Sequence, residues 1–303
     1  GSAIWKKLLK YGFGNPKFGG CLLTANKKEL NLVNPIEVED WFSKNKPEIV
    51  ISAAARVGGI QAHRNFPADF LLENLKIQNN LIENSYKFGV KRFLFIASSC
   101  IYPFASNQLT NENSLMESNI DSDNQWYGIA KIAGIKACDA MKIQYNFDSM
   151  SIVPTNLYGP GDHFDPEKSH VIASLIRKFV MAKKNNDEFV TCWGSGESTR
   201  EFLHVDDLAE ACIFLLNKWF PEKDDLNYIN VGSGIDTKIK DLANLIKLEA
   251  GFKGRIVWDL NMPEGRSRRA FDLKKMREMG WTHKIDLKDG LRESIDFFKK
   301  NYL

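Results

Sequence analysis

The sequence predicts an α/β protein built on a doubly wound parallel sheet, and two observations support this prediction. Short apolar runs alternate with longer segments whose apolar side chains recur at helical spacing. The runs also end in small or polar residues, as in RFLFIASSC and PEIVISAAA. Such runs are typical of buried parallel strands that end at a binding site. Strands that alternate with helices in this way form a parallel sheet with helices on both faces.

The elements are expected in a regular order up to residue 161. They are a helix over 1–11, a strand over 19–25, a helix over 36–44, a strand over 47–55, a helix over 68–88, a strand over 92–97, a helix over 125–145 and a strand over 147–156. Beyond residue 161 the pattern loosens, which indicates a smaller α/β lobe for the substrate. Residues 202–216 are expected to return to the main sheet as a strand and a helix. The domains are therefore predicted as 1–160, with a return segment near 201–220, and an interleaved lobe over 161–303.

Composition excludes several classes of protein. The chain has 303 residues, of which 44% are hydrophobic and 26% charged, as in ordinary soluble domains. Its net charge of +3 is too small to indicate a nucleic-acid partner. Its five cysteines are odd in number, widely spaced and without a C-x-x-C pair, which favours a reducing cytoplasm over disulfides or a zinc site. No membrane span or signal peptide is visible.

The most informative stretch joins the strand that ends at Ser98 to the helix that carries Tyr127 and Lys131. These last two residues are four apart, so they lie on one helical face. A phenol has a pKa of about 10, and a nearby ammonium lowers it. The Ser98 hydroxyl could orient the reacting oxygen. Y-x-x-x-K alone usually marks a solvated pair. The apolar strand that ends in SSC upstream favours a proton donor for a carbonyl that is being reduced.

Longer motifs carry a resemblance to a known family. SSCIYP followed by YGIAK resembles the extended short-chain dehydrogenase/reductase family. Within it, PTNLYGPGDHFDPEKSHVI, WGSGESTREFLHVDDLA and NVGSG are similar to enzymes that epimerise and reduce GDP-4-keto-6-deoxy sugars. The match covers nearly the whole chain. It implies a Rossmann-like domain, a GDP-sugar substrate, NADPH as cofactor and a homodimer without nucleic-acid or membrane partners.

The start of the chain departs from this pattern. A nucleotide-binding sheet normally begins with a strand and a Gly-rich turn before its first helix, and neither is visible. In the resembled family that turn ends in a glycine followed by residues similar to Ser2, Ala3 and Ile4. We therefore expect Gly1 to be the last glycine of the turn, with the first strand and most of the turn missing. The alternative is that Gly1 and Ser2 are left from a tag.

The resemblance implies two further catalytic residues. A cysteine at a strand end is usually a small buried hydrophobe, and a lone histidine is usually structural. In the family, residues matching Cys100 and His170 are the base and the acid for epimerisation beside the ketone. The full catalytic set is then Ser98, Cys100, Tyr127, Lys131 and His170.

Cofactor and substrate residues follow from the same resemblance, and no metal is expected. Lys27 stands just after the strand predicted over 19–25, where a basic residue favours the 2′-phosphate of NADP; the alternative is a solvated lysine. The expected cofactor contacts are Gly1, Lys27, Ile96, Ala97, Ser98, Ser99, Tyr127, Lys131, Pro154, Thr155, Asn156, Leu157 and His170. The expected substrate contacts are Lys178, Trp193, Arg200 and Arg269. Asp206 and Asp207 are interpreted as a helix cap.

Two other functions stay open from the sequence. One is another sugar-nucleotide epimerase, dehydratase or reductase of the same family, although such enzymes normally do not pair this cysteine with this histidine. The other is a non-catalytic nucleotide-binding protein on the same fold. An intact set of Ser98, Tyr127 and Lys131 argues against the second.

Overall fold

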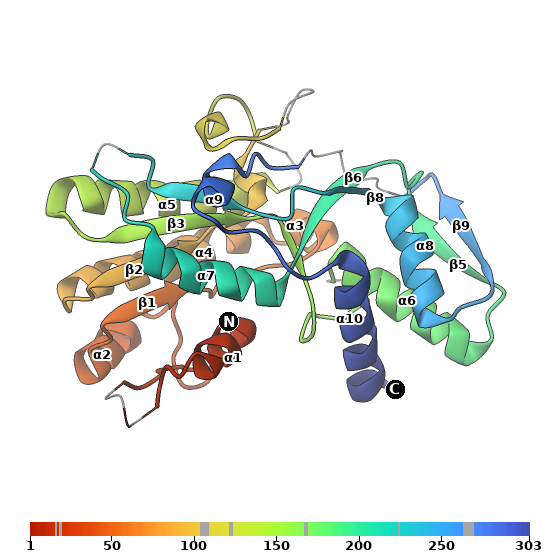
Figure 1. Cartoon of the computed structure of the whole chain (residues 1–303), viewed down its shortest axis with the longest axis horizontal. Helices are drawn as coiled ribbons and strands as arrows, with labels where there is room; N and C mark the ends of the chain where they lie inside the picture. Colours follow the sequence, from red (N-terminus) through yellow and green to blue (C-terminus); the bar gives the residue numbers. More distant parts are fainter. Residues whose placement is uncertain are drawn as a thin grey trace.

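Figure 1 shows the computed structural model, in which a larger layered region lies beside a smaller one. The structure describes residues 1–15, 17, 20–103, 109–120, 124–166, 169–223, 225–262 and 270–303, with the backbone alone at residue 60. No helix within these ranges is both long enough and apolar enough to cross a membrane.

The larger region is built on a four-stranded parallel sheet. Its strands are β1 (Ile49–Ser52), β2 (Arg92–Ile96), β3 (Ser149–Pro154) and β7 (Tyr228–Val231), in the order β1-β2-β3-β7. All three neighbouring pairs run parallel. The predicted doubly wound parallel architecture is confirmed, and the carboxyl ends of four strands share one edge.

Helices cover both faces of this sheet because successive strand residues point to opposite faces. Phe93 and Phe95 pack with α2 (Pro35–Asn45), α4 (Pro67–Lys87) and α5 (Gln125–Tyr145). Leu94, between them, packs with α1 (Ser2–Lys10) and α7 (Val205–Lys218) on the other face. Gly134 lets α5 lie close to the sheet, because a Cβ there would collide with the Phe95 ring.

The smaller region has its own core around α6 (Val171–Asn185), α8 (Ile239–Ala250) and α10 (Leu287–Tyr302). Two strands, β5 (Phe189–Trp193) and β9 (Arg255–Asp259), pair in parallel beside these helices. A three-stranded sheet of β4 (Asn156–Tyr158), β6 (Thr199–His204) and β8 (Asp236–Lys238) lies between the two regions (Figure 1). Short elements complete the fold: α3 (Ile60–Asn65), α9 (Lys274–Glu278) and the 3₁₀ turns Ser99–Ile101 and Glu112–Ser114.

Two expectations about strands were wrong. Residues 20–25 form no strand, because the described chain places no neighbouring strand beside them and a strand needs a hydrogen-bonded partner. The strand β6 does not join the main sheet. The chain continues past β3 into β4, which gives β6 its partner outside that sheet. The strand that returns to the main sheet is β7, whereas helix α7 does pack on it. The domain limits at residues 160 and 161 stay a prediction.

The start of the chain agrees with the expected helix, and the expectation that a preceding strand is missing stays a prediction. Gly1 caps α1, and no described strand precedes this helix. In the described part of the sheet β1 forms an edge, and its first residue, Ile49, is 51% exposed.

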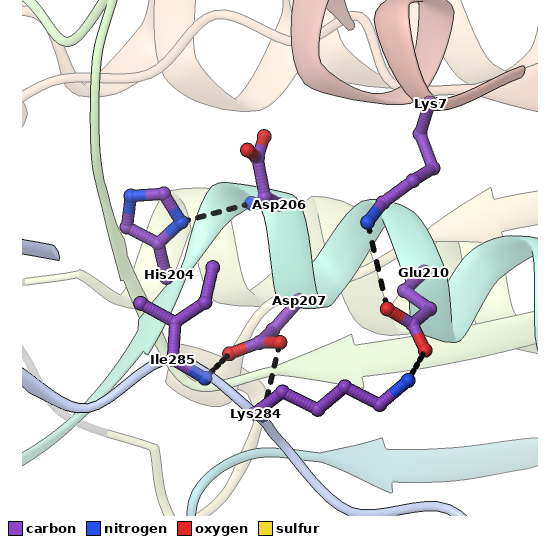
Figure 2. A network of polar contacts seen from close by, with 7 residues as sticks. All are labelled: Lys7, His204, Asp206, Asp207, Glu210, Lys284 and Ile285. Carbon is purple, nitrogen blue, oxygen red and sulfur yellow. Dashed lines mark hydrogen bonds and ion pairs between the residues drawn. The ribbon is translucent and has the colours of Figure 1, made fainter. Parts of the chain in front are cut away.

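The start of α7 differs from the predicted aspartate cap (Figure 2). The helix is capped by His204, whose Nδ1 accepts a hydrogen bond from the Asp206 backbone N–H at 3.3 Å. Asp207 is buried, and its two carboxylate oxygens accept the backbone N–H groups of Lys284 and Ile285 at 3.1 and 3.0 Å. The carboxylate therefore anchors the segment that leads into α10. The described residues hold no group of histidine, cysteine and acidic side chains suited to a metal ion.

Candidate active site

Ser98, Tyr127 and Lys131 meet at the carboxyl end of β2. Ser98 hydrogen-bonds the Tyr127 phenol through its side chain. The Lys131 Nζ donates to the Ile96 carbonyl at 2.8 Å and lies 5.7 Å from the centroid of the Tyr127 ring. Lys131 is only 3% exposed, so its position is fixed by the strand end and by the helix turn below Tyr127.

Cys100 belongs to the same group. It lies in the 3₁₀ turn Ser99–Ile101 that follows Ser98, and it is buried. The amino end of α5 fits closely against this turn because Gly128 has no side chain. A Cβ on Gly128 would stand 2.9 Å from the Cys100 carbonyl oxygen. The thiol interacts electrostatically with both Tyr127 and Lys131, so it lies beside the predicted proton donor.

The electrostatics of Tyr127 differ from the sequence-based expectation. Burial raises the pKa of the phenol well above its ordinary value, and a negative charge on Cys100 raises it further. Only the hydrogen bond with Ser98 opposes this rise in pKa. The Lys131 ammonium, which donates to the Ile96 carbonyl and lies 4.6 Å from the centroid of the Phe95 ring, does not offset this effect of burial. Tyr127 is therefore held as a neutral acid.

Lys131 has the opposite perturbation. Burial lowers the pKa of its ammonium to about 8, and a negative charge on Cys100 acts against that fall. The same attraction acts on both partners, so a protonated Lys131 favours a thiolate at Cys100. The cysteine, the lysine and the tyrosine form one coupled group.

His170 caps α6 and is exposed. It interacts electrostatically with two groups: Asp162 and His63, a residue that the sequence analysis did not select. His63 is buried, with its ring centroid 3.9 Å from that of Phe70 and 5.6 Å from that of Tyr127. Burial lowers the pKa of His63 to about 4, so its imidazole is neutral near pH 7. His63 therefore lies near both the predicted acid for epimerisation and the predicted acid for reduction.

The predicted cofactor residues divide into two sets. Ile96, Ala97, Ser98 and Ser99 continue β2 to the group described above, and Ala97 donates its N–H to the Ile152 carbonyl at 2.8 Å. Pro154, Thr155, Asn156 and Leu157 lie at the carboxyl end of β3 and the start of β4. Both sets thus line the same edge of the sheet, whereas Lys27 is exposed in a turn after residues that form no strand.

Three of the four predicted substrate residues are described, and they lie in the smaller region and on β6. The Lys178 Nζ donates to the Thr191 carbonyl at 2.9 Å and lies 5.5 Å from the centroid of the Trp193 ring. Trp193 is 46% exposed, so one part of its indole is open to a stacking partner. Arg200 is half-buried on β6. Arg269 lies outside the described residues.

Comparison with known proteins places this geometry in a family. Residues 1–232 match the model of the NAD dependent epimerase/dehydratase family. The chain belongs to this family. It is 47% identical over 301 residues to GDP-L-fucose synthase 1 of Arabidopsis thaliana, an alignment that covers 99% of this chain and 90% of the relative.

Two solved structures have folds closely similar to that of this chain. A GDP-6-OMe-4-keto-L-xylo-heptose reductase from C. jejuni has a TM-score of 0.91 and 34% identity, with 99% of this chain and 94% of that chain covered. A GDP-L-fucose synthetase from Naegleria fowleri bound to NADP has a TM-score of 0.87 and 26% identity, with 100% and 90% covered.

The carboxyl edge of the sheet fits the dinucleotide that the family description implies. Ala53 and Ala54 follow β1 and are exposed, so a ligand can approach the backbone closely there. The amino end of α1 faces the segment after β4: the Ser2 Oγ lies 4.0 Å from the point where a Cβ of Gly161 would stand. A helix amino end attracts phosphate.

Proposed function

We propose that the chain converts GDP-4-keto-6-deoxy-D-mannose to GDP-L-fucose, by epimerisation at positions 3 and 5 followed by NADPH-dependent reduction at position 4. The observation that carries this proposal is the placement of Cys100 within the Ser98, Tyr127 and Lys131 group. An enzyme that only reduces a 4-keto group needs Ser98, Tyr127 and Lys131 but not Cys100. A thiol beside them supplies a base for removing protons next to the same ketone.

Epimerisation begins at a carbon beside the ketone, where a proton is acidic because the resulting enolate is delocalised. The Cys100 thiolate takes this proton and becomes a thiol. The His170 imidazolium returns a proton to the opposite face of the carbon and becomes neutral. Cys100 then gives its proton to solvent and His170 regains one, so the proton balance closes. Lys131 favours the thiolate form of Cys100 through their attraction.

Reduction uses the same ketone. NADPH, when bound, supplies the hydride for the position-4 carbon. Tyr127 donates its phenolic proton to the ketone oxygen, which Ser98 orients by hydrogen bonding. The phenolate that remains is stabilised by the Lys131 ammonium. Because burial holds Tyr127 neutral before the reaction, the proton is available over the whole physiological pH range.

The binding residues of this proposal come from both regions. The two sets around Ala97 and Thr155 would hold the nicotinamide half of the cofactor, with the amino end of α1 near its phosphates. Lys178, Trp193 and Arg200 would hold the GDP moiety. The exposed indole of Trp193 can stack on guanine, and the guanidinium of Arg200 can bind phosphate.

We further propose a cytoplasmic homodimer. All five cysteines lie in the described ranges, and none forms a disulfide. The helices α4 and α5 expose apolar side chains, among them Leu72 at 52%, Ile129 at 41% and Ile143 at 58%. Such side chains support a contact with a second copy through this pair of helices.

The direct test is to supply GDP-4-keto-6-deoxy-D-mannose with NADPH and identify the sugar nucleotide formed. We expect GDP-L-fucose together with the loss of NADPH absorbance. NADPH consumption that yields an unepimerised 6-deoxy sugar would remove the roles of Cys100 and His170. Absence of turnover while NADPH still binds would point to a different sugar nucleotide.

The kcat/KM for the reduction should fall as the pH rises above about 8. The pKa of Lys131 is lowered to about 8, so its ammonium is lost as the pH rises through that value and the phenolate of Tyr127 loses its stabilising charge. The measurement is kcat/KM against pH, with Lys131→Met as the control that should be slower and lack this limb. A wild-type profile that stays flat to about pH 10, near the ordinary lysine pKa, would contradict the assignment.

A further inference from the structure

Glu201 is a buried carboxylate on the strand that lies between the two regions. It is 3% exposed and belongs to β6, which pairs with β4 on one side and β8 on the other (Figure 1). A buried carboxylate is costly unless hydrogen bonds satisfy it. The hydrogen bonds to this carboxylate therefore indicate the role of Glu201 in the fold.

The carboxylate holds two backbone segments. One oxygen accepts the N–H of Gly234 at 2.8 Å and the other accepts the N–H of Phe271 at 2.7 Å. The N–H of Ser233 is also a donor to it. Gly232 has no side chain to interfere, because a Cβ there would collide with the carboxylate. The carboxylate thus fixes the turn that follows β7 through two backbone N–H groups and the segment at Phe271 through a third.

The backbone carbonyl of Glu201 contacts two of the predicted cofactor residues, at the carboxyl end of β3. The Glu201 carbonyl accepts hydrogen bonds from the Thr155 hydroxyl at 2.8 Å and from the Asn156 side-chain amide at 2.9 Å. Thr155 in turn donates its N–H to the Val231 carbonyl at 3.1 Å. One residue therefore connects the carboxyl ends of β3 and β7, and Arg200 is its neighbour on β6.

A carboxylate suits this place better than an amide. All three backbone partners are donors, and a carboxylate offers only acceptors. Burial raises the pKa of Glu201, and the three N–H groups act against that rise because they stabilise the charged form. Glutamine has nearly the same shape but would turn an NH₂ group toward a backbone N–H, so one segment would lose its partner.

We propose that Glu201 is a positioning residue that fixes Thr155 and Asn156 relative to Arg200, and so aligns the cofactor half of the site with the substrate half. This inference rests on the proposed function. Its failure can still be distinguished, because the hydrogen bonds of Glu201 can be followed without turnover. A displacement of about 1 Å between reacting groups can cost on the order of 10²-fold in rate.

The experiment compares Glu201→Gln with Asp207→Asn. Asp207 is a matched control: it is 2% exposed, and its carboxylate also accepts two backbone N–H groups, at the start of α7 and outside the candidate site (Figure 2). Both variants should lower Tm, since both leave buried donors poorly satisfied. Only Glu201→Gln should lower kcat/KM, by on the order of 10²-fold, with KM for the GDP-sugar raised. It alone should speed amide hydrogen exchange at Ser233, Gly234 and Phe271, which donate to the carboxylate, and at Thr155, whose N–H donates to Val231 just before that turn.

The outcomes separate the two claims. Loss of Tm in Glu201→Gln with wild-type kcat, KM and exchange over these residues would overturn the positioning role. If the wild-type protein does not turn over the GDP-sugar, the proposed function fails. Faster exchange at Thr155, Gly234 and Phe271 in Glu201→Gln alone would still support the positioning of these segments by Glu201. Glu201→Asp, which keeps the charge but withdraws it by one methylene, replaces Glu201→Gln if that variant does not fold. Wild-type kcat and KM in Glu201→Asp would then contradict the proposal.

Discussion

Tyr127→Phe should lower kcat for the reduction by about 10²–10⁴-fold, the usual contribution of a positioned general acid. The variant keeps the ring that packs against His63 and Phe70, and it removes only the hydroxyl that Ser98 hydrogen-bonds. NADPH binding should therefore change little. The measurement is the initial rate of NADPH oxidation, together with the Kd for NADPH from fluorescence.

The matched control for this variant is Tyr145→Phe. Tyr145 is the last residue of the same helix, is 45% exposed and stacks on Tyr86 with ring centroids 4.6 Å apart. Loss of its hydroxyl should leave kcat unchanged. If Tyr127→Phe kept a wild-type reduction rate, another proton donor would have to be sought. Exchange of substrate ring protons with solvent should persist in Tyr127→Phe, because that step depends on Cys100.

Cys100→Ser should lower the epimerisation rate by about 10²–10⁴-fold and lower the reduction rate much less. A serine hydroxyl at this place is a far weaker base than a thiolate beside the Lys131 ammonium. The substitution leaves Tyr127, Lys131 and Ser98 in place for the hydride step. Epimerisation is measured without NADPH, as the uptake of solvent deuterium at positions 3 and 5 of the substrate.

Cys21→Ser provides the control for Cys100→Ser. Cys21 is exposed, whereas the other cysteines are buried and their loss would disturb the core. Cys21→Ser should take up deuterium and oxidise NADPH at wild-type rates. Equal losses of deuterium uptake and reduction in Cys100→Ser would argue against the separate role of Cys100 as the base for epimerisation.

The strands and helices around the catalytic group were predictable because local pattern and tertiary position agree there. The run RFLFI became β2, and the helix carrying Tyr127 became α5, whose Gly128 and Gly134 allow close packing that spacing alone does not reveal. Because Lys131 follows Tyr127 by four residues, the two side chains lie one helical turn apart on the same face of α5.

The remaining features depend on partners that a local pattern cannot supply. Residues 20–25 have strand-like composition, but no described strand pairs with them. The strand β6 was expected in the main sheet, but it pairs with β4, the strand that begins just after Thr155. Two titratable residues sit beside apolar positions in the sequence: Glu201 next to Phe202 on β6, and His63 in the short helix α3. Only the fold shows what surrounds them.

The most direct test of the shared site is to run the complete reaction in D₂O with unlabelled NADPH and return the product to H₂O. If Cys100 and His170 exchange protons at positions 3 and 5 and NADPH supplies the hydrogen at position 4, the sugar should carry deuterium at positions 3 and 5 and protium at position 4. A product without deuterium at positions 3 and 5 would contradict the account, because the ketone would then be reduced without prior epimerisation at this site.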